Sequence, residues 1–300
     1  MNMSISIVLV VLAAALVSCH ADVAAGAICP KPASPKKFNV FPDYEVKEDG
    51  EPGTLDYKIE FFDKESGDQI SPWHDIPHGL ESTKEGAFVW VVNEIPKGDL
   101  AKMETMAKRE GNPIQQDDES VEDADGEELY TRPRYYGYGP SLVNYGSIPQ
   151  TWEDSGNPDE ITEEIGDGDP LDSLDIGKAV APMGLVYKIK ILGALPLMDS
   201  EETDWKIVGI NEMDPLAEEY SDFSDIPEEK REAIYNWFRD YKTAAGKGQL
   251  AYHPIDADPE EHWYSPKDAV KIIKAKNASW KTLMDGTCGE ACEEIWMPET

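Results

Sequence analysis

The sequence has few basic residues for its length. Its 27 Lys and Arg stand against 60 Asp and Glu, which gives a formal net charge of −33 at pH 7. Nucleic acid is therefore excluded as a partner, because its phosphates would meet a surface of the same charge. Cations are favoured as partners instead. A folded protein is still expected, since 300 residues, 40% of them hydrophobic and 9% aromatic, can bury a substantial core.

Long hydrophobic runs are also missing. The most apolar stretch, Ile5–Val17, is too short to predict a membrane span, and small residues follow it. This pattern is typical of a secretory signal peptide, although no Lys or Arg precedes the stretch. We therefore predict a secreted or secretory-pathway protein without a membrane span after processing. The expected parts are a signal peptide over 1–21, an arm over 22–53, a catalytic domain over 54–285 and a C-terminal tail over 286–300.

Cysteines and histidines are scarce, with 4 Cys and 5 His. Loss of Cys19 with the signal peptide leaves three cysteines, an odd number. Cys288 or Cys292 could form a disulfide with Cys29 in an oxidising compartment. A glycosylation sequon begins at Asn277 and would be used if the chain is exported and the site is exposed. His74 and His78 have a spacing that could bind zinc, but the WHDIPH context around them favours a structural role.

Periodicity predicts several strands followed by two late helices. Apolar and polar positions alternate over Leu55–Phe61, as in a half-buried strand. A helix is expected after Pro227, where apolar residues follow helical spacing, and a second between Ser265, its N-cap, and Gly286. Strands followed by helices indicate the α+β class. Buried strands are also expected over 86–94, 184–192 and 205–210.

The strongest chemical signal is the segment DGDPLD over 167–172. It places three carboxylates within six residues, and these repel one another unless a cation lies between them. Oxygen ligands suit hard cations such as Mg²⁺ and Mn²⁺. The strand period of two also places Lys102 with Glu104, and Asp204 with Lys206, on common faces. Taken alone, Lys102 and Glu104 would be a solvated surface pair that contributes little to stability, although a carboxylate beside an ammonium is also what a site joining a metal ion to an anion requires.

An ordered series of motifs carries a family resemblance. The motifs are WHDIP at 73–77, EIP at 94–96, AKME at 101–104, NPIQQD at 112–117, NYGSIPQTWED at 144–154, GDGDPLDSLDIG at 166–177, ETDWKI at 202–207 and NWFRDYK at 236–242. From about Leu55 to about Leu283 the sequence closely resembles the soluble family I inorganic pyrophosphatases of eukaryotic type. The resemblance implies a twisted five-stranded, OB-like closed β-barrel flanked by helices, and a homodimer. It also implies Mg²⁺-dependent hydrolysis of inorganic diphosphate to two phosphates by direct attack of metal-bound water, with two or more Mg²⁺ ions per site and Mn²⁺ as an alternative.

The same resemblance assigns roles to individual residues. Asp167, Asp172 and Asp204 would hold the tightest metal ions, and Asp172 would be shared between two of them. Asp169, also among the metal-binding residues, would be the base for the nucleophilic water. The remaining metal ligands would be Asp199, Glu104 and Glu94, and the residues contacting phosphate oxygens would be Lys102, Tyr145, Lys206, Tyr241 and Lys242.

One stretch departs from the family pattern. The family places a Tyr in a G-Y-x-x-N-Y-G sequence, whereas this chain reads GYGPSLVNYG over 137–146. A three-residue insertion matches Tyr138, our choice for the catalytic hydroxyl, and an ungapped match gives Ser141. The family's phosphate-binding Arg is also out of register, and we predict Arg132 in its place, with Arg134 as the alternative.

Two further functions fit the sequence. One is a secreted acidic protein that binds Ca²⁺ or mineral on a pyrophosphatase fold, with weak or no activity. The export signal, the net charge of −33 and the altered stretch would suit it. The other is a hydrolase shifted toward longer polyphosphates through the altered stretch.

Overall fold

The computed structural model describes residues 37–122, 128–255 and 262–298, all within the unit Ser34–Thr300. The predicted signal peptide, Cys29 and the first part of the expected arm lie outside these residues. Within the described ranges, none of the helices combines the length and the apolar character needed to cross a membrane.

Five strands pair in a closed ring. The ring runs from β5 (Ala87–Ile95) to β10 (Asn144–Ser147), β11 (Asp172–Asp175), β13 (Glu202–Asn211) and β12 (Val186–Asp199), which pairs back with β5. Only the β11–β13 pair is parallel. Closure removes open strand edges, as in OB-like barrels, and agrees with the expected five-stranded barrel. Two short strands, β4 (Glu81–Ser82) and β14 (Ala251–Tyr252), extend the sheet at β5 and β12.

The barrel strands bury side chains on both faces. In β13, Trp205 and Ile207 belong to one core cluster, whereas Val208 and Ile210 belong to the other. A long Val- and Ile-rich strand buried on both sides accounts for the continuous apolar runs of the sequence. Gly146 lies where β10 approaches β5 too closely for a side chain, because an added Cβ would lie 1.9 Å from the Val92 carbonyl oxygen.

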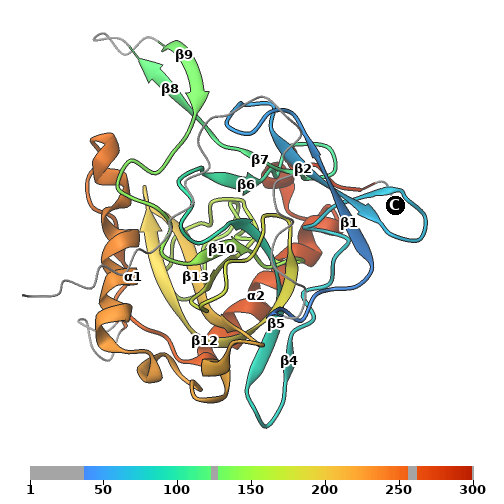
Figure 1. Cartoon of the computed structure of the whole chain (residues 1–300). Helices are drawn as coiled ribbons and strands as arrows, with labels where there is room; N and C mark the ends of the chain where they lie inside the picture. The colour runs from blue at the N-terminus through green and yellow to red at the C-terminus, as the bar shows by residue number, and fades with distance from the viewer. Residues whose placement is uncertain (1–36, 123–127, 256–261, 299–300) are drawn as a thin grey trace, which may run out of the picture. The chain divides into compact units, whose positions relative to one another are not determined.

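Two helices pack against the barrel, as predicted. In Figure 1, α1 (Glu228–Asp240) lies alongside β12 and β13, and its Ile234, Trp237 and Phe238 join the larger core cluster. The second helix, α2 (Pro266–Met284), covers β12 with an apolar stripe that includes Ile272 and Ile273. The Ser265 side chain caps α2 by accepting a hydrogen bond from the Asp268 amide.

A second sheet is formed by strands that come before and after β5 in the sequence. Its order is β1 (Tyr44–Asp49), β2 (Lys58–Asp63), β7 (Ile114–Gln116) and β6 (Met103–Thr105), with β3 (Gln69–Ile70) on β2. β1 falls within the expected arm, so the sheet begins before residue 54. A separate hairpin, β8 (Asp118–Glu122) with β9 (Glu128–Pro133), projects from the domain (Figure 1). The remaining elements are the 3-10 helices η2 (Pro215–Glu218), η3 (Phe223–Asp225), η4 (Tyr241–Ala245) and η5 (Gly289–Cys292).

The structure corrects two expectations about the C-terminal region. Asn277 is a buried residue of α2, and its side-chain nitrogen donates a hydrogen bond to the Gln150 carbonyl at 2.6 Å. The atom that would carry a glycan is therefore enclosed. Cys288 forms its disulfide with Cys292, so this bond closes a short loop and does not tie the two ends of the chain together.

The structural role expected for His74 is confirmed. Its ring is buried, receives a hydrogen bond from the Trp280 indole at 2.9 Å and contacts the Trp296 carbonyl at 3.1 Å. Since an indole N–H can only donate, Nδ1 of His74 accepts and Nε2 carries the proton. Both ring nitrogens are thereby engaged, and neither is free for zinc.

Candidate active site

A polar cleft is lined by side chains from the barrel, from the second sheet and from the end of α1. Every predicted site residue except Tyr138 and Arg132 lines it. The lining includes seven carboxylates, Glu94, Glu104, Asp167, Asp169, Asp172, Asp199 and Asp204, and four cations, Lys102, Arg134, Lys206 and Lys242. Residues separated by more than a hundred positions along the chain therefore form one charged surface.

The loop before β11 brings two of these carboxylates to the cleft. Gly168 has a φ of +89°, which favours glycine, and it separates Asp167 from Asp169. The Asp169 amide donates to the Asp167 carboxylate at 3.0 Å, and the Trp152 indole donates to the Gly168 carbonyl at 3.1 Å. These bonds fix a turn that presents both carboxylates to the cleft.

Lys206 is the buried cation at the centre of the carboxylates. Its ammonium donates to Asp172 and to Asp204, and the Tyr145 hydroxyl also donates to Asp172. Burial opposes the charge on Lys206, but Asp172 and Asp204 hold its pKa well above the usual range. Burial raises the pKa of Asp204 to about 7, against the opposing effect of Lys206.

Two other carboxyl groups also resist ionisation in the cleft. Burial, followed by the charge of Asp172, raises the pKa of Glu94 to about 8 and that of Asp169 to about 6. Glu94 accepts hydrogen bonds from the Thr105 hydroxyl at 2.6 Å and from the Thr105 amide at 3.2 Å, which favour its charged form. Cations placed among these groups would favour the ionised state of all of them.

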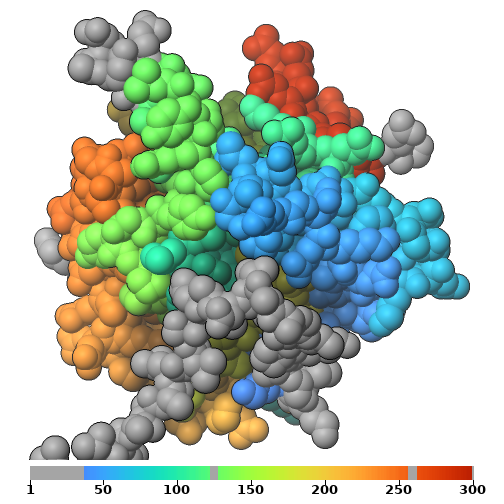
Figure 2. All heavy atoms as spheres, turned by 45° about the horizontal axis from the view of Figure 1, so that its top comes forward, coloured from blue at the N-terminus to red at the C-terminus, as the bar shows by residue number. Residues whose placement is uncertain are grey.

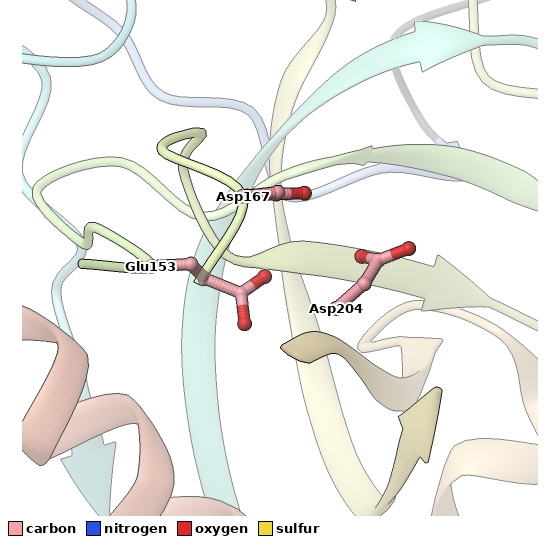
Figure 3. A group of neighbouring side chains, drawn as sticks. All are labelled: Glu153, Asp167 and Asp204. Carbon is pink, nitrogen blue, oxygen red and sulfur yellow. The ribbon is translucent and has the colours of Figure 1, made fainter. Parts of the chain in front are cut away.

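Glu153 lies in the motif NYGSIPQTWED but was not among the predicted metal ligands. One oxygen each of Glu153, Asp167 and Asp204 lies within 4.8 Å of the others, and Figure 3 shows the three carboxylates gathered in one place. Glu153 is 1% exposed, and one oxygen accepts from the Trp205 amide at 3.0 Å. Its other oxygen is buried and has no hydrogen-bond partner among the described residues.

This donor set fits a hard divalent cation. All of the candidate ligands are carboxylate oxygens, which suit Mg²⁺ and Mn²⁺, and sulfur and imidazole ligands are absent from the cleft lining. The unpartnered buried oxygen of Glu153 is a second indication, because a buried polar atom without a partner is destabilising unless a ligand satisfies it.

The structure does not support two site predictions. Arg132 lies on β9, is exposed, and donates to Glu119 at 2.8 Å. Tyr138 is 44% exposed, and its hydroxyl makes only a long 3.5 Å contact with Asp240. The alternative Ser141 is buried and donates to the Val143 carbonyl at 2.8 Å. None of the three lines the cleft.

Arg134 and Tyr136 line the cleft instead. Backbone hydrogen bonds hold this segment against residues 100–102. The Lys102 amide donates to the Arg134 carbonyl at 3.1 Å, and the Tyr136 amide donates to the Leu100 carbonyl at 2.8 Å. Because the segment is extended, residues two apart point to the same side. Arg134 was the open alternative for the arginine, whereas Tyr136 was missed.

Tyr136 lines the cleft from within a group of aromatic side chains. Its ring packs edge-on against Trp237, with centroids 4.9 Å apart, and against Tyr241 at 5.8 Å. Burial raises the pKa of Tyr136 well above its usual value, so the phenol stays protonated and can donate. Lys206, Asp172 and Arg134 are close enough to influence this pKa, and the hydroxyl has no hydrogen-bond partner among the described residues.

Asp117 orients two of the cations at the cleft. It accepts from Lys102 at 3.0 Å and from Arg134 at 2.9 Å, and its backbone carbonyl accepts from the Arg134 amide at 2.8 Å. Lys102 also pairs with Glu104. The arrangement keeps an ammonium and a guanidinium side by side, as an anionic ligand with several oxygens requires.

Fold and cleft together define a class: an OB-like barrel whose carboxylates can hold divalent cations next to a group of cationic and phenolic donors. Comparison with known proteins gives the family. Residues 91–281 match the inorganic pyrophosphatase family model. The chain belongs to this family.

Individual relatives agree with the family match. The mouse inorganic pyrophosphatase is 39% identical over 245 residues, which cover 80% of this chain and 79% of the relative. The inorganic pyrophosphatase of Candida glabrata is 38% identical over 248 residues, which cover 81% of this chain and 80% of the relative. Among solved structures, the inorganic pyrophosphatase of Trypanosoma brucei brucei superimposes with a TM-score of 0.70 at 32% identity, over 84% of this chain and 73% of the other. The type I inorganic pyrophosphatase of Toxoplasma gondii superimposes with a TM-score of 0.67 at 32% identity, over 80% of this chain and 99% of the other.

Proposed function

We propose that this protein is a Mg²⁺-dependent inorganic diphosphatase, which hydrolyses diphosphate to two orthophosphates. The observation that carries the proposal is the composition of the cleft. Its seven carboxylates suit divalent cations, and its four cations and three tyrosines suit phosphate oxygens. Family membership and the names of the relatives support the same activity.

The carboxylates would hold the metal ions. Asp167, Asp172 and Asp204 form the first group, and Glu153 adds a fourth carboxylate beside it. A second group is Glu94, Glu104 and Asp199. When bound, Mg²⁺, or Mn²⁺ in its place, would neutralise substrate charge and lower the pKa of water.

Asp169 would accept the proton of the attacking water. Burial and the neighbouring charge of Asp172 raise its pKa to about 6, which suits a proton acceptor working near neutral pH. Lys102 and Lys206 oppose this rise and favour the ionised form. The carboxylate is thus basic enough to take a proton while remaining ionised at neutral pH.

The donors of the cleft would bind the two phosphoryl groups. The pair Lys102 and Arg134, held by Asp117, would contact oxygens on one side of the cleft. Tyr136, Tyr145 and Tyr241 would donate from their hydroxyls, and Lys206 and Lys242 from their ammonium groups. We assign to Tyr136 the catalytic hydroxyl that was predicted at Tyr138, because Tyr136 lines the cleft and its hydroxyl has no hydrogen-bond partner among the described residues.

Release of orthophosphate from diphosphate tests the proposal directly. Purified protein should turn over diphosphate with Mg²⁺ and lose this activity with EDTA. Ca²⁺ binding should be measured in parallel, because the alternative function, a secreted acidic protein that binds Ca²⁺ or mineral, predicts Ca²⁺ binding with only trace hydrolysis. Only trace hydrolysis of diphosphate at saturating Mg²⁺ would refute the proposed diphosphatase activity.

Export and dimer formation are further parts of the proposal. The apolar stretch Ile5–Val17 supports a secretory route, and the Cys288–Cys292 disulfide agrees with an oxidising compartment. A mature N-terminus upstream of residue 20 in protein from the native source would contradict export. The homodimer depends on the family resemblance, and analytical ultracentrifugation would test it.

A further inference from the structure

A second, wider groove adjoins the cleft. It lies between the β8–β9 hairpin, the segment 134–137 and η4 with the residues after it, and we call it the outer groove. It shares Arg134, Tyr136, Tyr241 and Lys242 with the cleft. Figure 2 shows the hairpin region, in green, next to the orange region that includes α1 and η4. The outer groove has a volume of about 580 Å³, whereas the cleft has about 150 Å³.

The two cavities have opposite charge balance. Carboxylates outnumber cations in the cleft, whereas the outer groove has four cations, Arg132, Arg134, Lys242 and Lys247, against Asp118 and Glu119. The chain as a whole has 60 acidic and 27 basic residues, so a cation-rich groove is a local exception. Such a lining attracts an anion rather than a metal ion.

Two of the groove's cations have donors available for a ligand. The Lys247 ammonium has no ion pair or hydrogen bond among the described residues, and Lys247 lies just after the left-handed Gly246 that ends η4. Arg132 uses its Nε–H for Glu119 at 2.8 Å, and its terminal nitrogens have no partner among the described residues. Neither residue lines the cleft.

We propose that the outer groove binds the additional phosphoryl units of an inorganic polyphosphate chain longer than diphosphate. This inference rests on the proposed diphosphatase function. The two terminal units would occupy the cleft, and the rest of the chain would pass Arg134 and Lys242, which border both cavities, to reach Arg132 and Lys247. Guanidinium and ammonium groups are the donors that recognise phosphate oxygens.

The hydrolytic step needs only water. With tripolyphosphate, the oxygen of water bonds to the terminal phosphorus while the bond from that phosphorus to its bridging oxygen breaks. The bond's electron pair leaves with diphosphate. One proton of the water stays on the new orthophosphate, and the other is accepted by Asp169 and passes to solvent or to the leaving diphosphate. The diphosphate is then a substrate for the same site.

The test compares two substrates across three proteins. kcat/KM is measured with Mg²⁺ for diphosphate and for tripolyphosphate in the parental protein, in the double variant Arg132→Ala/Lys247→Ala and in Lys274→Ala. Lys274 is an exposed residue of α2 that lines neither cavity, so its variant controls for the loss of a surface charge. The double variant should lose about three- to tenfold in kcat/KM for tripolyphosphate, as expected for two exposed charge contacts, and less than about twofold for diphosphate.

The outcomes separate this inference from the proposed function. If the parental protein does not hydrolyse diphosphate, the proposed function fails. If it hydrolyses diphosphate but not tripolyphosphate, or if the double variant loses equally on both substrates or on neither, the groove assignment is wrong. A higher kcat/KM for ATP than for tripolyphosphate would assign the groove to a nucleoside and would also overturn the inference.

Discussion

Asp172 and Lys206 are register partners across the parallel strands β11 and β13, and the Lys206 ammonium donates a hydrogen bond to the Asp172 carboxylate. Tyr145, on the neighbouring strand β10, donates to the same carboxylate. Three barrel strands thus place a carboxylate, an ammonium and a phenol in contact. This group explains why the barrel is required for the site: each strand contributes one side chain, and strand pairing sets their spacing.

Asp172→Asn should reduce kcat by more than about a hundredfold, since Asp172 is the proposed shared metal ligand and its loss should cost at least as much as loss of an outer-shell partner. The amide keeps the shape of the side chain and can still accept from Tyr145, so the fold should persist. Phosphate release and circular dichroism would measure the two effects. Near-parental turnover at saturating Mg²⁺ would contradict the assignment.

Tyr136→Phe should lower kcat/KM for diphosphate by about ten- to a thousandfold, the range for losing one oriented donor or general acid. The matched control is Tyr138→Phe, which removes an exposed hydroxyl two residues away and should change the rate less than about threefold, because its contact with Asp240 is weak. A reversed ranking of the two variants would return the role to Tyr138.

Mg²⁺ should raise the thermal midpoint of the protein, and Glu153→Gln should reduce that rise. Binding to the folded state alone adds about 2.7 kcal/mol to stability when the ligand is at 100 times its Kd. Scanning calorimetry with Mg²⁺ and with EDTA would measure the shift. The control is Glu164→Gln, an exposed acidic residue outside the cleft lining. An equal Mg²⁺ response in parental protein and Glu153→Gln would remove Glu153 from the metal site.

His74 should make the fold acid-sensitive. Burial lowers its pKa from 6.5 to about 4, so the unfolded chain binds a proton that the folded protein excludes. The stabilising contribution is complete above pH 6.5 and is lost as the pH falls toward 4. Between pH 7 and pH 4, the free energy of unfolding measured with urea should fall by about 3 kcal/mol more for the parental protein than for His74→Gln, whose residue 74 does not titrate. Parallel pH curves for the two proteins would refute the idea.

Peptide mapping of protein made in a eukaryotic secretory route should find Cys288 bonded to Cys292 and Asn277 without glycan. The asparagine side chain is buried against Gln150, and the two sulfurs belong to one short loop. A peptide that links Cys29 to either of these cysteines, or a glycan on Asn277, would show that the C-terminal region folds differently.

Local patterns in the sequence were sufficient for most elements. The alternation over Leu55–Phe61 corresponds to β2, the apolar runs correspond to β5, β12 and β13, and the two helices begin after Pro227 and Ser265 as expected. These features depend on neighbouring residues alone, through strand periodicity, helix spacing and capping. The lysines of the cleft and all of its seven carboxylates except Asp199 belong to ungapped motifs, and this made them identifiable from the sequence.

Long-range pairing decided the rest. Whether Arg132 or Arg134, and Tyr136 or Tyr138, faces the cleft depends on how residues 134–136 pair with residues 100–102, and the local sequence does not specify that register. In an extended segment a shift of register changes which side chains face the site. Likewise, a sequon at Asn277 is readable in the sequence, but its burial depends on Gln150, 127 positions away. Chemistry that follows from adjacent residues can be predicted from the chain, whereas chemistry that depends on which distant backbone lies opposite requires the folded structure.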